Sequence, residues 1–520
     1  MNPYRHLMLA FDGAGVPPWL GDVLTYSPIA GVSLFRELNL ESPGQTAELV
    51  ESLQAKNTAG SPLLVAIDQE GGQLQGLVGS TPFAGNMALG AADDVDLTRR
   101  VARAMAHELA AVGINLNYAP VADIATRPGN PSLGVRSFGE DPTRVGAHVA
   151  AAVEGFRSGG VLSTLKHFPG KGEAVVDPHY ELPRMDLDLA RLETVELVPF
   201  ASGIEAGANL LMTGHYGVPA LTGSDETPVS MSERAIDGFI RSEMGFEGVV
   251  ITDALDMGAL DQGAGQVVDI IASLRGGTDL LLVMPDEGLR ERARLAVERG
   301  AARGLIPMEA LDASARRVDA LRRSIPKTVL DPGVVGSHVD LAGELARSAL
   351  TLVRDDADNI PLRLDHASRV LVLEPEPTNV TPADTTALYP ASLAEAVRNR
   401  HGQVSQVVFP HEPTASDIAG LLTRSEEADL VVVGTVNATR GQADLVTALT
   451  GLGEPVVTIA MREPQDLPTY PEVSTHICTY SGHAPSLAAA IDAMFGLIGF
   501  PGRLPVAIPG LYPIGHGATK

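Results

Sequence analysis

The chain has 520 residues, a formal net charge of −26 and a single cysteine, Cys478. A chain of this length exceeds the usual size of one hydrophobic core, so we expect two domains, or three at most. The acidic charge argues against a nucleic-acid partner, and one cysteine excludes an internal disulfide.

No part of the sequence is apolar over the length needed to span a membrane, and residues 1–12 have no signal-peptide core before charge returns. We therefore predict a cytoplasmic protein without a membrane partner. The acidic residues are dispersed over helix-like segments and predict solvated faces rather than a binding site.

Short apolar runs alternate with longer amphipathic segments over the first part of the chain. The runs predict eight strands, at residues 7–11, 31–35, 63–67, 114–118, 160–165, 209–212, 248–251 and 280–283. Helical periodicity lies between most of them, at residues 97–110, 144–156, 232–244 and 267–275. Eight βα units over about 325 residues predict a TIM-type (β/α)8 barrel.

Polar residues follow most of these predicted strands directly. They include Asp68 after the third strand, Asp123 after the fourth, His215 after the sixth and Asp253 after the seventh. A barrel carries its chemistry on the loops at the carboxyl ends of its strands. Any one of these residues could belong to a turn or cap a helix, but their repetition after successive strands favours a functional site.

The loop after the fifth strand, residues 166–179, holds two histidines, two lysines and an aspartate around glycines. It closes with Asp177-Pro-His179. A histidine exchanges protons near neutral pH through one ring nitrogen. A carboxylate hydrogen-bonded to the second ring nitrogen fixes the tautomer. An isolated Asp-x-His is more often a solvated pair, but this polar surrounding favours a catalytic role.

The periodicity breaks after residue 323, and a second α/β alternation follows. Its predicted strands lie at residues 350–353, 370–373, 404–409, 430–433, 456–460 and 476–480, and its helices at 392–399, 415–422 and 486–494. We predict a barrel domain over residues 1–325, a linker over 326–345 and a C-terminal α/β sandwich over 346–520.

Several motifs together resemble glycoside hydrolase family 3. They are Asp68-Gln-Glu-Gly-Gly72, residues 113–123, Arg136-Ser-Phe-Gly-Glu-Asp-Pro142, Lys166-His-Phe-Pro-Gly170, Asp177-Pro-His179 and residues 245–253. The Lys166-His-Phe-Pro-Gly170 loop, closed by Asp177-Pro-His179, is similar to the β-N-acetylhexosaminidase branch of that family, the NagZ type. The resemblance covers the whole predicted barrel in order, and the sandwich resembles the C-terminal domain of the family.

The resemblance implies a retaining double displacement. Asp253 corresponds to the nucleophile, His179 to the acid/base and Asp177 to the residue that orients the histidine. Asp256 is a competing nucleophile on sequence alone, but we expect it to have entered the following helix.

The same resemblance implies a sugar site at Asp68, Arg136, Lys166 and His167. Asp123 and His215 point into such a site by their position after strands, although Asp123 fits a supporting structural acid equally well. Met257 could pack on the sugar ring or simply fill the core. The three histidines lack metal-ligand spacing, so no metal and no cofactor are expected.

Two departures from the branch affect the expected substrate. The usual arginines after Asp68-Gln-Glu-Gly-Gly72 are absent, with Gln73 and Gly76 in their places, and Lys171 replaces a histidine of the loop. The favoured prediction is an exo-β-N-acetylglucosaminidase acting on terminal GlcNAc, for example of peptidoglycan or chitin fragments. The alternatives are a β-N-acetylglucosaminide phosphorylase, a family 3 glycosidase of shifted specificity, and a non-catalytic sugar-binding protein.

Overall fold

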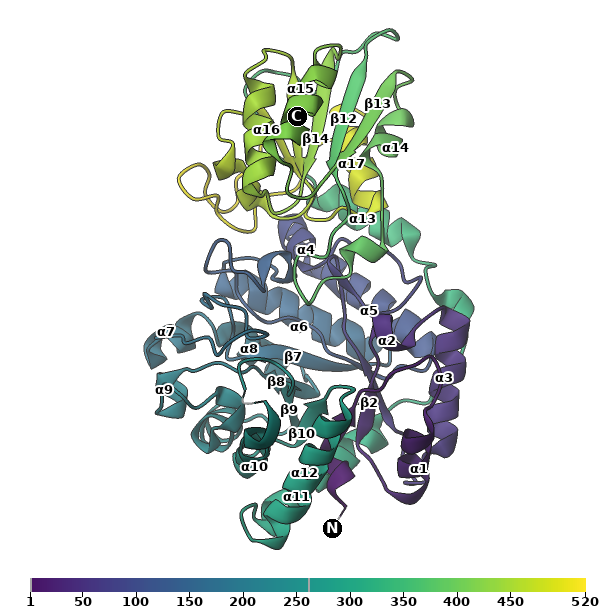
Figure 1. The fold of residues 1–520 in the computed structure, drawn as a ribbon, viewed down its shortest axis with the longest axis vertical. Coiled ribbons are helices and arrows are strands. Elements are labelled where there is room, and N and C mark those ends of the chain that lie inside the picture. Colours follow the sequence, from purple (N-terminus) through teal and green to yellow (C-terminus); the bar gives the residue numbers. More distant parts are fainter. Residues whose placement is uncertain (1, 261) are drawn as a thin grey trace.

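A computed structural model of the chain describes residues 2–260 and 262–520. Residues 1 and 261, which fall in the predicted barrel domain, lie outside the described part. Figure 1 shows two parts stacked along the long axis, with α4 (Asn86–Ala92) and α13 (Val339–Ala349) at their junction. The predicted order, a barrel followed by an α/β domain, is confirmed.

Parallel strands of the first part close into a barrel in the order β1-β10-β9-β8-β7-β6-β3-β2. Their bounds are β1 (Leu7–Leu9), β2 (Gly31–Ser33), β3 (Leu64–Ile67), β6 (Leu116–Asn117), β7 (Leu162–Phe168), β8 (Leu210–Thr213), β9 (Val249–Ala254) and β10 (Leu280–Val283). The closure is made by β1, which pairs with both β10 and β2. Each strand coincides with or overlaps one of the predicted runs.

Side chains of the barrel strands alternate between two buried environments. Met8, Leu64 and Ile251 belong to a core inside the barrel, whereas their neighbours Leu7 and Val65 belong to the larger core outside it. Because both faces of each strand are buried, the strands are continuous apolar runs rather than alternating ones. This double packing gives the loops at the strand ends a rigid base.

Helices follow the strands in the expected alternation. Besides α4, those of the barrel part are α1 (Pro18–Tyr26), α2 (Arg36–Asn39), α3 (Pro43–Lys56), α5 (Val95–Ala111), α6 (Pro142–Ser158), α7 (Leu189–Thr194), α8 (Val198–Glu205), α9 (Pro219–Thr222), α10 (Gln266–Arg275), α11 (Glu287–Ala302) and α12 (Met308–Ser324). The helix predicted at 232–244 is a π-helix, Arg234–Glu243. No helix among the described residues combines the length and apolar character needed to cross a membrane.

The second part is a mixed sheet covered by helices. Its strands are β11 (Thr351–Asp355), β12 (Val370–Pro375), β13 (Val404–Phe409), β14 (Leu430–Thr435), β15 (Val456–Ala460) and β16 (Thr475–Cys478), in the order β11-β16-β15-β14-β12-β13. Only the pairing of β11 with β16 is antiparallel among these described strands. The helices are α14 (Leu393–Arg398), α15 (Ala415–Ser425), α16 (Arg440–Thr450) and α17 (Ala484–Met494). Helix α16 was not predicted from the sequence.

The predicted linker, residues 326–345, is partly helical. It includes a 3-10 turn at Pro332–Val334 and the first half of α13, which packs against α4 and α5 of the barrel part and α17 of the second part. A packed helix therefore joins the two parts. The exact domain boundaries stay a prediction.

Candidate active site

A cavity of about 290 Å³ opens at the carboxyl ends of the barrel strands. Seven of the predicted site residues line it: Asp68, Arg136, Lys166, His167, His179, Asp253 and Met257. The other three, Asp123, Asp177 and His215, lie behind this lining. The expectation that strand-end residues converge is therefore met: Lys166, His167 and Asp253 lie on β7 and β9, and the other four lie in segments that follow β3, β6, β7 and β9.

Asp253 lies near the end of β9 and is partly exposed to the cavity. Its Oδ1 accepts a hydrogen bond of 2.8 Å from the backbone N–H of Ala254. Burial alone would raise the pKa of Asp253, but the nearby imidazoles of His167 and His215 and this N–H lower it overall. The carboxylate is therefore ionised at neutral pH.

Asp256 lines the same cavity but differs in its electrostatics. It lies in a turn ahead of α10, which begins at Gln266, so the expectation that it has entered a helix is wrong. Burial raises the pKa of Asp256, whereas the pKa of Asp253 is lowered. A nucleophilic carboxylate must be ionised, which favours Asp253 over Asp256.

His179 and Asp177 form a hydrogen-bonded pair. The His179 Nδ1 lies 2.6 Å from Asp177 Oδ1, and the backbone N–H of His179 donates to the same oxygen at 3.0 Å. The Asp177 side chain is 5% exposed and the His179 side chain 34%. Because Asp177 can only accept when ionised, the proton is held on Nδ1 and Nε2 is left for the cavity.

The loop that carries this pair is tied to the loop after β9. The backbone N–H groups of Gly258 and Ala259 donate to the carbonyls of His179 and Pro178, both at 3.0 Å. A Cβ at Gly258 would lie 2.8 Å from the His179 carbonyl oxygen, so the approach requires glycine. His179 and Asp253 are thus held on one connected frame.

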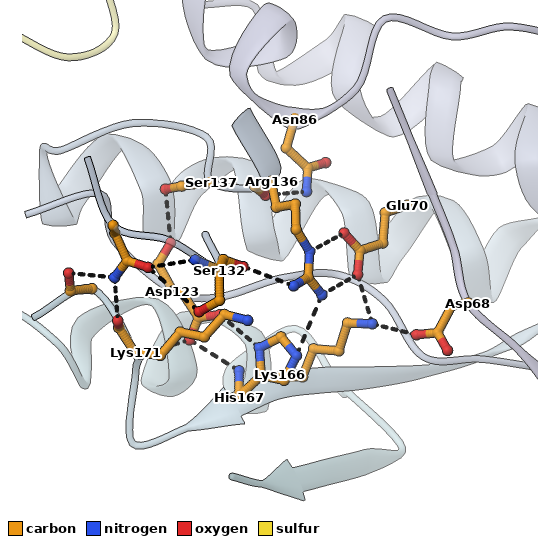
Figure 2. A network of polar contacts seen from close by, with 12 residues as sticks. Asp68, Glu70, Asn86, Asp123, Ser132, Arg136, Ser137, Lys166, His167 and Lys171 are labelled. Atoms are coloured by element: carbon orange, nitrogen blue, oxygen red, sulfur yellow. Dashed lines mark hydrogen bonds and ion pairs between the residues drawn. The ribbon is translucent and has the colours of Figure 1, made fainter. Parts of the chain in front are cut away.

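A buried charge network covers another wall of the cavity (Figure 2). Glu70 accepts two hydrogen bonds from Arg136, at 2.8 and 2.9 Å, and its Oε1 lies 2.7 Å from Lys166 Nζ. Lys166 Nζ also donates to Asp68 Oδ1. These cations hold the pKa of Glu70 far below its usual range, although burial alone would raise it. A buried carboxylate between two cations keeps both positioned.

Glu70 was not among the residues predicted from the sequence. It stands on β4 (Gln69–Gly71), which forms a short hairpin with β5 (Leu74–Gln75), and its side chain is 2% exposed. Its position inside the motif Asp68-Gln-Glu-Gly-Gly72 was the available signal. A buried carboxylate there needs a cation, and Arg136 and Lys166 were already predicted.

His167 is oriented from behind by Asp123. Its Nδ1 lies 2.7 Å from Asp123 Oδ2, and the other oxygen of Asp123 accepts from the backbone N–H groups of His167 and Lys171, both at 3.0 Å. Asp123 is fully buried. This geometry agrees with the expectation that Asp123 is a supporting structural acid. It leaves Nε2 of His167 as an acceptor, 3.4 Å from Nη2 of Arg136.

His215 does not line the cavity, although its place after a strand predicted that it would point there. Both of its ring nitrogens have partners, Ser230 Oγ at 2.7 Å and the carbonyl of Ala254 at 3.1 Å. Burial lowers the pKa of His215, so the ring is neutral and donates to that carbonyl. It therefore supports the backbone next to Asp253.

Residues of the second domain complete the mouth of the cavity. Pro382, Ala383, Asp384 and Thr385 line it, and Asp384 forms a buried ion pair of 2.5 Å with Arg462. The sequence left open whether the second domain covers the site. In the structure the loop after β12 reaches across to the barrel and forms part of the cavity wall.

Gln73, at the place of the first missing arginine, connects the two domains. Its Oε1 accepts from Arg462 Nη2 at 2.5 Å, its Nε2 donates to the carbonyl of Ala383 at 2.9 Å, and its own carbonyl accepts from Thr385 N at 2.7 Å. Gly76, at the second place, has no room for a side chain, since a Cβ would lie 2.6 Å from the carbonyl oxygen of Asp68. Gln73 therefore fits the domain junction, and Gly76 fits the close packing within the barrel part.

We expect Arg462→Met to lower the free energy of unfolding by about 3 kcal/mol or more, because it leaves the buried Asp384 carboxylate unpaired. Urea unfolding of the full chain measures this. The matched control is Arg100→Met, which breaks the exposed pair with Glu344, for which we expect less than about 1 kcal/mol. Equal effects of the two substitutions would contradict a junction held by Arg462.

The site and fold define an α/β-barrel protein with a carboxylate and a His–Asp pair on one polar cavity. Residues 20–321 match the model of the glycosyl hydrolase family 3 N-terminal domain. Among similar proteins are a beta-hexosaminidase A from Pseudoalteromonas piscicida, 35% identical over 69% of this chain and 65% of that protein, and a beta-hexosaminidase from Stenotrophomonas maltophilia, 35% identical over 59% of this chain and 92% of that protein.

The similarity to solved structures extends over both domains. The structure of a glycoside hydrolase family 3 beta-N-acetylglucosaminidase from Paenibacillus sp. str. FPU-7 superposes with a TM-score of 0.91, at 32% identity, over 97% of this chain and 98% of that one. This chain belongs to glycoside hydrolase family 3. The resemblance predicted from the motifs is confirmed, and the relatives named as hexosaminidases agree with the predicted branch.

Proposed function

We propose that the protein is a retaining exo-β-N-acetylglucosaminidase that releases a terminal β-linked GlcNAc. The observation that carries this proposal is that Asp253 and His179, the latter hydrogen-bonded to Asp177 behind it, line one cavity. The sugar is supported by the hexosaminidase and β-N-acetylglucosaminidase relatives, the latter aligned with almost the whole chain.

In the first step, Asp253 attacks the anomeric carbon while the bond to the leaving oxygen breaks. His179 donates its Nε2 proton to that oxygen, and a covalent glycosyl-enzyme forms on Asp253. In the second step the neutral His179 takes a proton from water, whose oxygen attacks the same carbon and frees Asp253. Two inversions retain the β configuration.

Asp177 acts on the reaction through His179. It stabilises the charged imidazole before the proton is donated and holds the proton of the neutral ring on Nδ1. The pKa of Asp177 is lowered because the hydrogen bonds from His179 outweigh the opposing effect of burial. Asp177 therefore stays ionised through the cycle and acts as a positioning residue.

The cleaved sugar is bound, in this proposal, by Asp68, Lys166, Arg136 and His167. Together they offer donors and acceptors for hydroxyl groups on one wall of the cavity. Met257, which is buried and lines the cavity, supplies an apolar surface for the ring. Glu70 keeps two of the cations in place.

A phosphorylase is the second candidate, and Lys171 is the observation that favours it. Lys171 lines the cavity, and burial, with the nearby charge of Arg136, lowers its pKa to about 8. It is mostly charged at pH 7 and could attract phosphate, whereas above pH 8 it loses that charge. A histidine acid/base also repels an incoming phosphate less than a carboxylate would.

We also propose that the natural substrates are fragments of peptidoglycan or chitin and that the protein acts in the cytoplasm. The hexosaminidase relatives support the sugar of such fragments. Cell fractionation followed by assay of each fraction with purified muropeptides and chitin oligomers tests both parts.

The decisive assay compares initial rates on para-nitrophenyl β-N-acetylglucosaminide and the matching β-glucoside, each with and without phosphate at pH 7. We expect at least a tenfold preference for the N-acetyl sugar and a rate independent of phosphate. Phosphate dependence, with GlcNAc 1-phosphate as product, would favour the phosphorylase. Turnover of neither sugar would favour a non-catalytic protein or a shifted specificity.

A further inference from the structure

A second cavity, of about 320 Å³, lies between the two domains and is separate from the catalytic one. Most of its lining follows β12, β14, β15 and β16 of the second sheet, with Val436 and Met461 directly after β14 and β15 and Tyr480 two residues after β16. Gly72 and Gln73 of the barrel form the opposite side. The proposed reaction uses none of these residues directly.

The place of this cavity in the sheet is one where α/β domains bind ligands. From β12 the chain runs to β13 on one side, and it then returns to β14 on the other side of β12. The connections after β12 and β14 therefore diverge and leave a crevice at the carboxyl ends of two adjacent parallel strands. In open parallel sheets this switch point is the usual ligand site.

The backbone at the floor of the cavity is strained. Tyr480 has a φ of 59°, in the left-handed region, and is 1% exposed. Its hydroxyl donates to Thr351 Oγ1 at 2.8 Å, which anchors the ring. A non-glycine residue in this region costs about 1 kcal/mol, and such strain gathers at ligand sites more often than elsewhere.

The lining selects against anions. Three carboxylates lie on it, those of Glu374, Glu376 and Glu395, and its only guanidinium among the described lining residues, that of Arg462, is already paired with Asp384. Glu374 is satisfied internally by Ser392 Oγ and other donors, whereas Glu376 and Glu395 are exposed at the rim and open to hydroxyl donors.

The rest of the lining mixes neutral polar side chains with apolar and aromatic ones, among them two tyrosines and three prolines. The apolar and aromatic members are Pro375, Pro377, Tyr389, Pro390, Val408, Val436, Met461 and Tyr480. Apolar and aromatic surfaces beside carboxylate and hydroxyl acceptors suit the C–H face and the hydroxyl groups of a sugar ring.

We propose that this interdomain cavity is a second, non-catalytic binding site for a neutral saccharide of one or two units. The proposal rests on the lining of this cavity and not on the specificity of the catalytic one. The two cavities share a wall, because Gln73 lines the second cavity and hydrogen-bonds Ala383 and Thr385 of the first. A bound saccharide would lie next to the catalytic mouth.

Methionine methyl signals in NMR of the full chain can test this site directly. Met461 lies on the second cavity and Met257 on the catalytic one, so 13C-methyl labelling reports on each separately. On titration with GlcNAc or N,N′-diacetylchitobiose we expect the Met461 signal to shift and saturate. GlcNAc 6-phosphate should leave it unchanged, because the carboxylates repel the phosphate.

Gly482 allows the cavity to be filled without a backbone clash. A Cβ there would meet only Met461 Cβ, at 3.9 Å, so Gly482→Trp can project into the cavity and Gly482→Ala is the matched control. We expect the apparent Kd read from Met461 to rise at least about tenfold in the Trp variant and to stay unchanged in the Ala variant. If Gly482→Trp does not fold, Val408→Trp, at a 52% exposed rim position, serves the same purpose.

Two outcomes would overturn the proposal. One is a Met461 signal that does not move with either neutral saccharide, and the other is a shift that persists equally in the filled variant. The Met257 signal separates this failure from that of the proposed function, since it follows saccharide binding at the catalytic cavity alone.

Discussion

Replacing Asp253 with asparagine should lower kcat/KM by about 10⁴-fold or more on every substrate, activated or not. The amide keeps the shape of the side chain and can still accept from Ala254 N, but it has no charge with which to attack the anomeric carbon. Steady-state rates on aryl glycosides and on N,N′-diacetylchitobiose measure the loss.

Asp256→Asn is the matched control, because Asp256 lines the same cavity three residues further on. We expect this substitution to lower kcat/KM less than about tenfold, because the raised pKa of Asp256 makes its ionised form less favoured. In Asp253→Ala, added azide should restore turnover and give the α-glycosyl azide. A larger loss in Asp256→Asn than in Asp253→Asn would reverse the assignment of the nucleophile.

Replacing His179 with alanine should separate substrates by their leaving groups. On N,N′-diacetylchitobiose, whose leaving hydroxyl needs a proton, we expect a loss of about 10²- to 10⁴-fold in the rate of glycosyl-enzyme formation. On the 2,4-dinitrophenyl glycoside, which departs without protonation, that step should lose less than about tenfold. Pre-steady-state kinetics resolve the step.

Asp177→Asn should give an intermediate loss with the same dependence on the leaving group. An amide cannot stabilise the charged imidazole, although it preserves the shape of the pair. His366→Ala, at an exposed position of the second domain, controls for the loss of a histidine. Equal losses on both substrates in His179→Ala would remove His179 from the acid role.

The domain junction has a consequence for how substrates enter. The loop after β12 forms part of the cavity wall and is held by Arg462 through Asp384 and Gln73. The cleaved sugar is held by barrel residues alone in our proposal. In the same proposal the second domain acts on the entrance of the cavity, which Pro382, Ala383, Asp384 and Thr385 line.

The local sequence pattern was sufficient to predict much of the fold of this molecule. The barrel strands were predictable because each is a short apolar run buried on both faces, and β10, Leu280–Val283, matches its prediction residue for residue. The predicted members of the cavity follow from the rule that chemistry lies at the carboxyl ends of barrel strands. The helix at 234–243 was also located, although its π-type hydrogen bonding was not.

Other features depend on where side chains end up in space. Chain position placed His215 towards the site, yet its hydrogen bonds to Ser230 and to the Ala254 carbonyl turn it to a supporting role. Position likewise placed Asp256 in a helix, although it lies in a turn on the cavity. Neither outcome leaves a trace in hydrophobic periodicity.

The sequence by itself determined the barrel, the family and the set of polar residues that meet at the strand ends, because these depend on short-range pattern and on motifs. Only the tertiary structure decided which residues Gln73, in the place of the first missing arginine, and Glu70 contact. Gln73 bonds to partners 310 and 389 residues away, and Glu70 to an arginine 66 residues away. Contacts between residues so far apart in the sequence form only when the chain packs, so no local sequence pattern predicts them.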